Sequence, residues 1–261
     1  INQSFNVDPA LVRAWADRRN GVGFDQMLIV EPPQTDRAAF RYRIFNADGG
    51  EVSQCGNGAR CFARFVRENE LTDEDVITVE TNAGLLELQA VDESRVRVNM
   101  GVPQFDPALI PLATDNEQKQ YTINHEGEYI HFSALSIGNP HMIIQVEDVD
   151  TAPVERLGTV LESHEFFPQR VNVGFMQIVD RKQFRLRVFE RGVGETLACG
   201  SGACAAMVAA VKSGELDNQA RAFLRGGELK LEWQGDGKPV MMTGDTALVF
   251  EGEIDYEQND E

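Results

Sequence analysis

Apolar and polar residues alternate over many short segments of the chain, which is the pattern of half-buried strands. The clearest cases are "FRYRIFN" (40–46) and "FRLRVFE" (184–190), where large apolar residues alternate mainly with arginine. The same pattern predicts further strands at residues 75–84, 85–91, 95–101, 128–138, 142–149, 221–227, 228–235 and 246–254. We therefore expect strands to make up most of the regular structure.

Helices are predicted at three places. Each "FR" strand is followed by a glycine-containing turn, then Cys55 or Cys199, then an alanine-rich segment. The second of these helices should end at Gly214, because glycine takes the left-handed conformation that closes a helix. Another helix should begin at Asp8 and Pro9, a capping residue followed by proline in the first turn.

The chain contains an internal repeat. When the sequence is shifted by 144 positions, residues 40–66 align with 184–210 without a gap, and 10 of the 27 pairs are identical. Unrelated segments of ordinary composition would share about one or two identities over this length. The pairs Cys55 with Cys199 and Gly56 with Gly200 are among the identities. The chain is therefore expected to consist of two homologous halves.

The pattern predicts an α+β fold of two pseudo-symmetric domains, each a curved and mostly antiparallel sheet wrapped around a central helix. We expect residues 1–104 to form the first half and residues 105–244 the second. The last strand, within 245–261, is expected to return to the first half and complete it. The active site should lie in the cleft between the halves, which we expect to close on the substrate about a hinge at 99–118.

Composition narrows the class of partner. The chain has 261 residues and a net charge of −18, with 42 acidic and 24 basic side chains. This charge repels nucleic acid and anionic lipid, so we expect neither as a partner. No apolar run reaches the roughly 18 residues of a membrane helix, and no leader segment is visible, so we expect a cytoplasmic protein.

The cysteines do not indicate a disulfide framework or a metal site. There are four cysteines and four histidines, and neither set has the spacing of zinc ligands. Cys61 and Cys204, inside their helices, are expected to be inert packing residues. We therefore expect no metal.

Cys55 and Cys199 have a different setting, because each stands at the start of a helix and before a Gly-x-Gly sequence. The first backbone N–H groups of a helix are unpaired and lower the pKa of a thiol placed there. The glycines also let these N–H groups approach a carboxylate. If the halves face each other, two such thiols flank one carbon atom, the arrangement needed for cofactor-free racemisation or epimerisation. Inert packing and a redox pair that forms an inactive disulfide are the alternatives.

Seven motifs in order give the chain a resemblance to the diaminopimelate epimerase family: "GVGFDQ", "RIFNADG", "QCGNGARC", "GNPH", "NVGF", "ERGVGET" and "ACGSGACA". The resemblance covers nearly the whole chain. It implies pyridoxal-independent interconversion of LL- and meso-2,6-diaminopimelate, in the synthesis of lysine and peptidoglycan precursors. It also implies that no cofactor takes part.

The resemblance assigns roles by position. Cys55 and Cys199 match the catalytic acid/base pair, and His141 and Glu190 match residues that adjust the pKa of the thiols. The expected substrate contacts are Gln26, Asn46, Gly56, Asn57, Asn139, Asn172, Glu190, Arg191, Gly200 and Ser201. Asn46 and Glu190 are equivalent in the repeat but differ in chemistry, as expected if the two halves recognise different groups of the substrate.

The sequence departs from the family at its beginning. It starts after the strand and the H-G-x-G-N-D segment with which the family opens, so we expect the first sheet and the cleft to lack that strand and its asparagine. The family also implies a homodimer, with Phe250 near the interface. The alternative functions are a racemase or epimerase of another amino acid, such as proline or hydroxyproline, and a thiol redox or metal-binding protein.

Overall fold

A computed structural model describes residues 7–52 and 55–254. Its helices are α1 (Pro9–Ala16), α2 (Gly56–Glu68), α3 (Val154–Leu161) and α4 (Gly200–Ser213). The strands of the first part of the chain are β1 (Gln26–Glu31), β2 (Phe40–Asn46), β3 (Glu51–Val52), β4 (Val76–Thr81), β5 (Gly84–Ala90) and β6 (Arg95–Asn99). Those of the remainder are β7 (Tyr121–His125), β8 (Glu128–Ser136), β9 (Pro140–Gln145), β10 (Asn172–Asp180), β11 (Gln183–Glu190), β12 (Gly194–Thr196), β13 (Gln219–Leu224), β14 (Gly227–Trp233) and β15 (Val240–Asp245).

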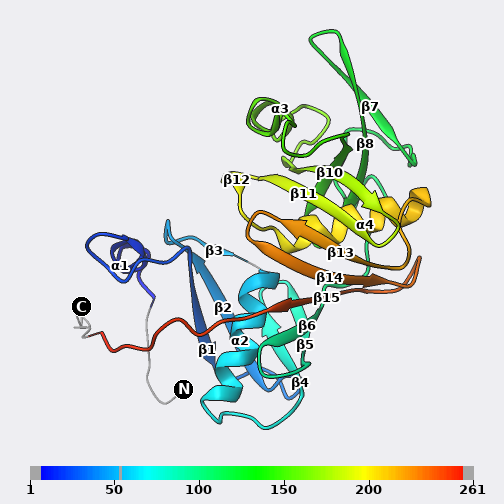
Figure 1. Cartoon of the computed structure of the whole chain (residues 1–261). Helices are drawn as coiled ribbons and strands as arrows, with labels where there is room; N and C mark the ends of the chain where they lie inside the picture. The colour runs from blue at the N-terminus through cyan, green and yellow to red at the C-terminus, as the bar shows by residue number, and fades with distance from the viewer. Residues whose placement is uncertain (1–6, 53–54, 255–261) are drawn as a thin grey trace.

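The strands of the described residues join in one path, in the order β1-β2-β4-β5-β6-β15-β14-β13-β11-β10-β9-β8-β7, with β3 and β12 paired beside it. Most neighbours are antiparallel, and the parallel pairs are β2 with β4, β11 with β13, and β9 with β10. Figure 1 shows β1–β6 around α2 in the lower part of the molecule, and β8–β14 around α4 in the upper part. The α+β fold expected from the sequence is confirmed.

The repeat is visible in the topology. From β1 to β6 and from β10 to β15 the order of elements, the parallel and antiparallel pairings and the position of the helix are the same. The equivalent strands β6 and β15 lie beside each other and run antiparallel, with Val98 opposite Met242, which is 144 positions later. Equivalent strands paired in this way place an approximate two-fold axis between them.

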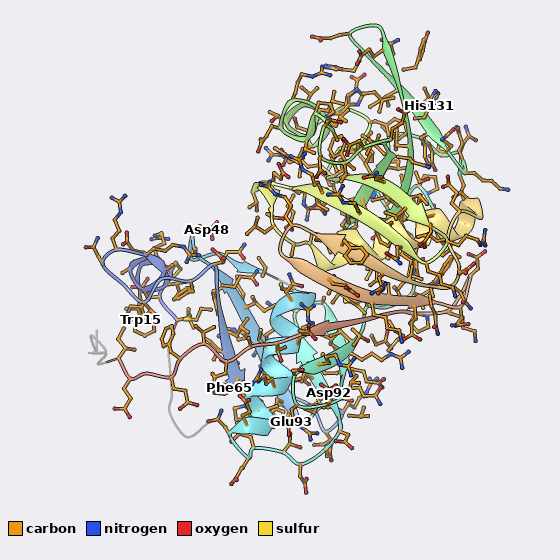
Figure 2. The ribbon with its side chains drawn as sticks, viewed as in Figure 1. Trp15, Asp48, Phe65, Asp92, Glu93 and His131 are labelled. Carbon is orange, nitrogen blue, oxygen red and sulfur yellow. The ribbon has the colours of Figure 1, made fainter. Side chains whose placement is uncertain are left out.

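The two helices that follow the cysteines differ in burial. Almost every residue of α4 up to Ala210 is buried, and most of these side chains are small, which lets the surrounding strands pack closely against the helix. One face of α2 stays exposed and carries Cys61 and Phe65. Figure 2 shows Phe65 on this face. The cores around the two helices are continuous through Met100 and Met242, and a separate core lies under α3 and β7–β9.

Several local predictions are confirmed. Asp8 caps α1, where its side chain accepts a hydrogen bond from the Ala10 N–H, and Pro9 is the first helical residue. Gly214 follows α4 with a φ of 83°. The helix α3 has no counterpart in the sequence-based expectations, although Val154, Leu157 and Leu161 have helical spacing and are buried.

The end of the chain differs from expectation. The strand beside the first half is β15, which pairs with β6 and ends at Asp245. Residues 246–254 form no strand, and residues 255–261 lie outside the described residues. A strand needs a neighbouring edge for its N–H and C=O groups. Within residues 7–52 and 55–254 the Thr246 N–H still donates to the Ser94 carbonyl, but no strand edge pairs with 247–254. In this described part no helix has the length and apolar character needed to cross a membrane.

Candidate active site

The two cysteines occupy the same local position. Cys55 is the capping residue of α2 and Cys199 that of α4, both with extended backbone. The Cys55 sulfur accepts a 3.5 Å hydrogen bond from the Gly58 N–H. The Cys199 sulfur lies 3.7 Å from the hydroxyl of Ser201. Each thiol therefore lies at the positive end of a helix, as the sequence predicted.

Long-range packing brings the two turns together at the axis between β6 and β15. Met242 of β15 packs against both helix ends: a Cβ added at Gly56 would lie 2.7 Å from its Cε, and one added at Gly200 would lie 3.0 Å from its Sδ. The Asn57 amide donates across the two halves to the carbonyl of Ala198, at 3.5 Å. Both glycines are therefore required by the close approach of the two turns.

Burial determines the protonation of the thiols. It raises the pKa of Cys55 above 9.0, while the N–H groups of Gly58 and Asn57 lower that pKa. Burial also raises the pKa of Cys199, which is 6% exposed, well above 9.0. The helix ends act in the direction that the sequence predicted, but desolvation outweighs them because the charged form of a thiol loses its hydration.

Glu190, the last residue of β11, influences both thiols. Its carboxylate raises the pKa of Cys55 and that of Cys199. The Thr196 hydroxyl donates a short hydrogen bond to Glu190 Oε1 and fixes its direction. The sequence prediction named Glu190 but not Thr196, although Thr196 is the last residue of the motif "ERGVGET".

A chain of polar contacts leads from His141 to Cys199. His141 is fully buried, and burial followed by the charge of Arg191 lowers its pKa to about 3, so the ring is neutral. Its Nε2 donates to Asn139 Oδ1 at 2.9 Å, because that oxygen only accepts. The Asn139 amide then donates to the Ser201 hydroxyl at 3.4 Å. This leaves the Ser201 proton free to point at the Cys199 sulfur.

Asn172 and Arg191 lie at the end of the same sheet but are engaged within the protein. The Asn172 amide donates to the Pro140 carbonyl at 3.0 Å and accepts from the Arg191 backbone N–H at 3.0 Å. The Arg191 side chain is exposed, and its guanidinium donates to the Gln169 carbonyl. In this structure the guanidinium of Arg191 is not directed at the cysteines.

Gln26 and Asn46 form a pair in the first half. They are opposite each other in β1 and β2, and Gln26 Nε2 donates to Asn46 Oδ1 at 3.0 Å. Gln26 also approaches the start of α2, since its Oε1 lies 3.7 Å from a Cβ added at Gly58. Both side chains are half-buried beside the Cys55 turn.

Arg60 was not among the residues predicted for the site, and the prediction for Cys61 was wrong. Arg60 is 9% exposed on the inner side of α2. Its signal was a lone arginine among the apolar residues Ala59, Phe62 and Ala63. Cys61 is exposed, so it is not a packing residue, whereas Cys204 is fully buried as expected.

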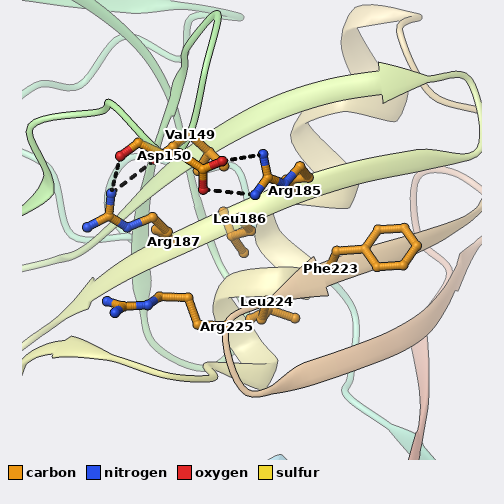
Figure 3. A pocket seen from close by; sticks show the side chains of 8 residues that line it. All are labelled: Val149, Asp150, Arg185, Leu186, Arg187, Phe223, Leu224 and Arg225. Atoms are coloured by element: carbon orange, nitrogen blue, oxygen red, sulfur yellow. Dashed lines mark hydrogen bonds and ion pairs between the residues drawn. The ribbon is translucent and has the colours of Figure 1, made fainter.

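A hollow of about 320 Å³ lies on the outer face of the second half, away from the cysteines (Figure 3). Arg185 in it forms two hydrogen bonds to Asp150, at 2.8 and 2.9 Å. Arg187 and Arg225 share the carboxylate of Glu195. Since each guanidinium here already has a carboxylate partner, this hollow is not a second candidate site.

The chain is similar to known proteins over nearly its whole length. The family model of diaminopimelate epimerase matches residues 2–105 and 133–249. The diaminopimelate epimerase of Nitrosomonas europaea is 55% identical over 255 residues, covering 98% of this chain and 92% of the relative. That of Ectopseudomonas mendocina is 54% identical, covering 97% and 92%.

Solved structures share the fold at low identity. A predicted epimerase from Pseudomonas aeruginosa has a TM-score of 0.65 at 17% identity, over 96% of this chain and 90% of that one. A hydroxyproline epimerase from Agrobacterium vitis has a TM-score of 0.64 at 18% identity, over 90% of this chain and 76% of that one. At such identities the likeness concerns the fold alone.

Proposed function

The chain belongs to the diaminopimelate epimerase family, and we propose that it interconverts LL- and meso-2,6-diaminopimelate with two cysteine thiols and no cofactor. This reaction serves the synthesis of lysine and peptidoglycan precursors. The observation that carries the proposal is the meeting of two cysteine-capped helix ends on one approximate two-fold axis.

The reaction inverts one carbon atom. The thiolate of one cysteine removes the α-proton, and the electron pair of the broken C–H bond is delocalised into the α-carboxylate. The thiol of the other cysteine then donates its proton to the opposite face of the carbon. The two sulfurs have exchanged protonation states, and the reverse reaction begins from the exchanged state.

The helix ends hold the α-carboxylate as negative charge develops on it. The N–H groups of Gly56 and Asn57 in α2, and of Gly200 and Ser201 in α4, belong to first turns and have no intrahelical partner. Burial of the turns strengthens these interactions because little water competes with them.

Glu190 and the substrate ammonium group have opposite effects on the thiols. The Glu190 carboxylate raises the pKa of both. A bound ammonium group neutralises this charge, so substrate binding favours the thiolate. Glu190 thus links recognition of the ammonium group to formation of the reactive thiolate. His141 acts on Cys199 through the hydrogen bonds of Asn139 and Ser201.

Recognition of the distal end of the substrate is assigned to Gln26, Asn46, Asn139, Asn172 and Arg191. Arginine binds a carboxylate with paired hydrogen bonds, and amides bind an ammonium through oxygen. To bind a substrate carboxylate, the Arg191 guanidinium would have to break its hydrogen bond to the Gln169 carbonyl. This bond lies at the surface, so its replacement by a bond to the carboxylate costs little free energy.

The expected organisation remains part of the proposal. Residues 1–104 form one half and residues 105–244 the other, with closure about 99–118 on substrate binding. The strand that pairs with the first half is β15 (Val240–Asp245), not one within 246–254. We propose a cytoplasmic homodimer with Phe250, 68% exposed, near its interface.

The test is isotope exchange with the reduced chain in D2O. Incubation with meso-diaminopimelate should replace the α-proton by deuterium and produce the LL isomer, both followed by NMR. Cys55→Ala and Cys199→Ala should each abolish inversion, while the matched control Cys61→Ala should keep it. Exchange of free proline or hydroxyproline instead would assign the alternative racemase, and stoichiometric zinc without exchange would assign a metal-binding protein.

A further inference from the structure

Arg60 is a buried cation without a carboxylate partner. It lies in α2, one turn after Cys55, and is 9% exposed. Within residues 7–52 and 55–254 its guanidinium forms no ion pair, and its Nε has no hydrogen-bond partner. Burial lowers the pKa of the group, as expected when a charge loses its hydration. Burial of an unpaired guanidinium lowers folding stability, so a role in the site is the better explanation for Arg60 at this position.

The guanidinium controls the amide that joins the two cysteine turns. Arg60 Nη1 donates to Asn57 Oδ1 at 3.0 Å and lies 3.9 Å from the sulfur of Met242. Since the oxygen of the Asn57 amide is held by Arg60, its Nδ2 is left to donate to the Ala198 carbonyl at 3.5 Å. Ala198 directly precedes Cys199. The opposite amide orientation would set two oxygens against each other.

Arg60 also breaks the symmetry of the repeat. Its equivalent, 144 positions later, is Cys204, which is uncharged and fully buried. The charged and titratable groups around Arg60 are Cys55 and Cys61 of α2, Cys204 of α4 and Asp245 at the end of β15. Those around Cys55 are Arg60 of α2, Tyr42 of β2 and Glu190 of β11. Arg60 favours the thiolate of Cys55 by its charge.

We infer that Arg60 is a positioning residue that makes the duplicated cysteine turns unequal, because it orients the Asn57 bridge to the Cys199 turn and brings a positive charge to the Cys55 side. The inference rests on the proposed function. It gives the two halves different electrostatic environments although their cysteine turns arose by duplication.

The experiment compares Arg60→Met, Arg60→Lys and the matched control Arg64→Met. Arg64 lies one turn further along α2 and pairs with Glu68, away from the cysteines. Two measurements are made on each reduced chain: the pH profile of kcat/KM for epimerisation, and the pH dependence of iodoacetamide alkylation of Cys55, read by peptide mass spectrometry. Urea unfolding checks that each variant is folded.

In Arg60→Met the loss of a nearby cation should raise the pKa of Cys55, so both profiles move to higher pH by on the order of 0.5–1 unit. The value of kcat/KM at neutral pH should fall about tenfold. It should fall by the same factor in both directions, as the unchanged equilibrium constant requires. Arg60→Lys keeps the charge and should restore the pH profiles but not the full kcat/KM, because lysine lacks the planar fork that reaches Asn57.

Profiles of Arg60→Met that coincide with those of the wild type and of Arg64→Met would overturn the inference, and so would a shift of equal size in Arg64→Met. Should Arg60→Met fail to fold, Arg60→Lys decides: alkylation of Cys55 at the wild-type pH together with a reduced kcat/KM supports the inference, and wild-type kcat/KM refutes it. An inactive wild type would refute the proposed function, and the alkylation profiles would still test the charge of Arg60.

Discussion

The neutral ring of His141 donates from Nε2 to Oδ1 of Asn139 at 2.9 Å, and this single bond sets the direction of the polar chain that ends at Cys199. Since burial keeps the ring uncharged, with a pKa of about 3, His141 orients its partner without exchanging protons in the neutral range. Its Nδ1 has no partner among the described residues, so the bond to Asn139 is its main polar contact.

Replacement of His141 by leucine should reduce activity by misorientation of Asn139 and Ser201. We expect kcat/KM to fall about tenfold to hundredfold, the cost of a small displacement at a reacting centre. The pH profile should keep its shape, because the wild-type ring does not titrate there. If the pH profile of His141→Leu lacked one of the two pH-dependent slopes of the wild type, this would contradict the prediction, since it would mean that the ring transfers a proton in the reaction.

The same residue makes folding stability depend on pH. The folded state keeps His141 neutral down to about pH 3, whereas the unfolded chain binds a proton below its ordinary pKa of 6.5. The free energy of unfolding should therefore be fully retained above pH 6.5 and should fall as the pH is lowered towards 3, by at most about 1.4 kcal/mol per pH unit from this group. Urea unfolding at several pH values should show a shallower slope for His141→Leu, while His131→Leu, on the exposed surface of β8, keeps the wild-type slope (Figure 2).

Glu190→Gln should increase thiol reactivity while it reduces activity. Removal of the carboxylate lowers the pKa of Cys55 and of Cys199, so their alkylation by iodoacetamide at mildly alkaline pH should accelerate, by about threefold to tenfold. Epimerisation should slow because the substrate ammonium loses its counter-charge. Exposed Cys61 provides the internal standard in each sample, and unchanged relative rates would show that Glu190 does not act on the thiols.

Gly56→Ala tests the contact between the helix ends. The added Cβ would lie 2.7 Å from Met242 Cε and 3.1 Å from Met100 Sδ, so we expect a loss of about 1–3 kcal/mol in the free energy of unfolding, together with lower activity. Met242→Leu removes the terminal methyl group. The double variant should therefore be more stable than the sum of the single changes predicts; strict additivity would mean that Met242 is not the limiting contact.

The repeat contains two equivalent ion pairs, one in each half, that differ in burial. Arg43 binds Glu51 through two hydrogen bonds, and Arg187 binds Glu195 in the same way. The Glu195 side chain is 6% exposed and the Glu51 side chain 28%. Glu195→Gln should cost about 3 kcal/mol of stability and Glu51→Gln about 1 kcal/mol or less, because the Glu195 carboxylate is the more buried of the two and also pairs with Arg225. Equal losses in urea unfolding would contradict the dependence on burial.

The sequence by itself determined the local elements and the duplication. Strands such as Phe40–Asn46 follow from a period of two, Asp8 and Gly214 delimit helices by capping chemistry, and the cysteine-led turns recur at a shift of 144. Strand periodicity and helix capping depend on a few neighbouring residues, and the duplication is found by aligning the chain with itself. The family resemblance rested on the same short segments.

The tertiary structure alone decided how the halves meet and what charge the site carries. The antiparallel pairing of β6 with β15 brings the cysteine turns together at Met242, and no local pattern encodes which edges pair. Desolvation reversed the expected shift in the pKa of the thiols. Packing of the halves buried Arg60, and a hydrogen bond to the Gln169 carbonyl holds Arg191 at the surface. Pairing and burial depend on residues distant in sequence, so they are fixed only when the chain is folded.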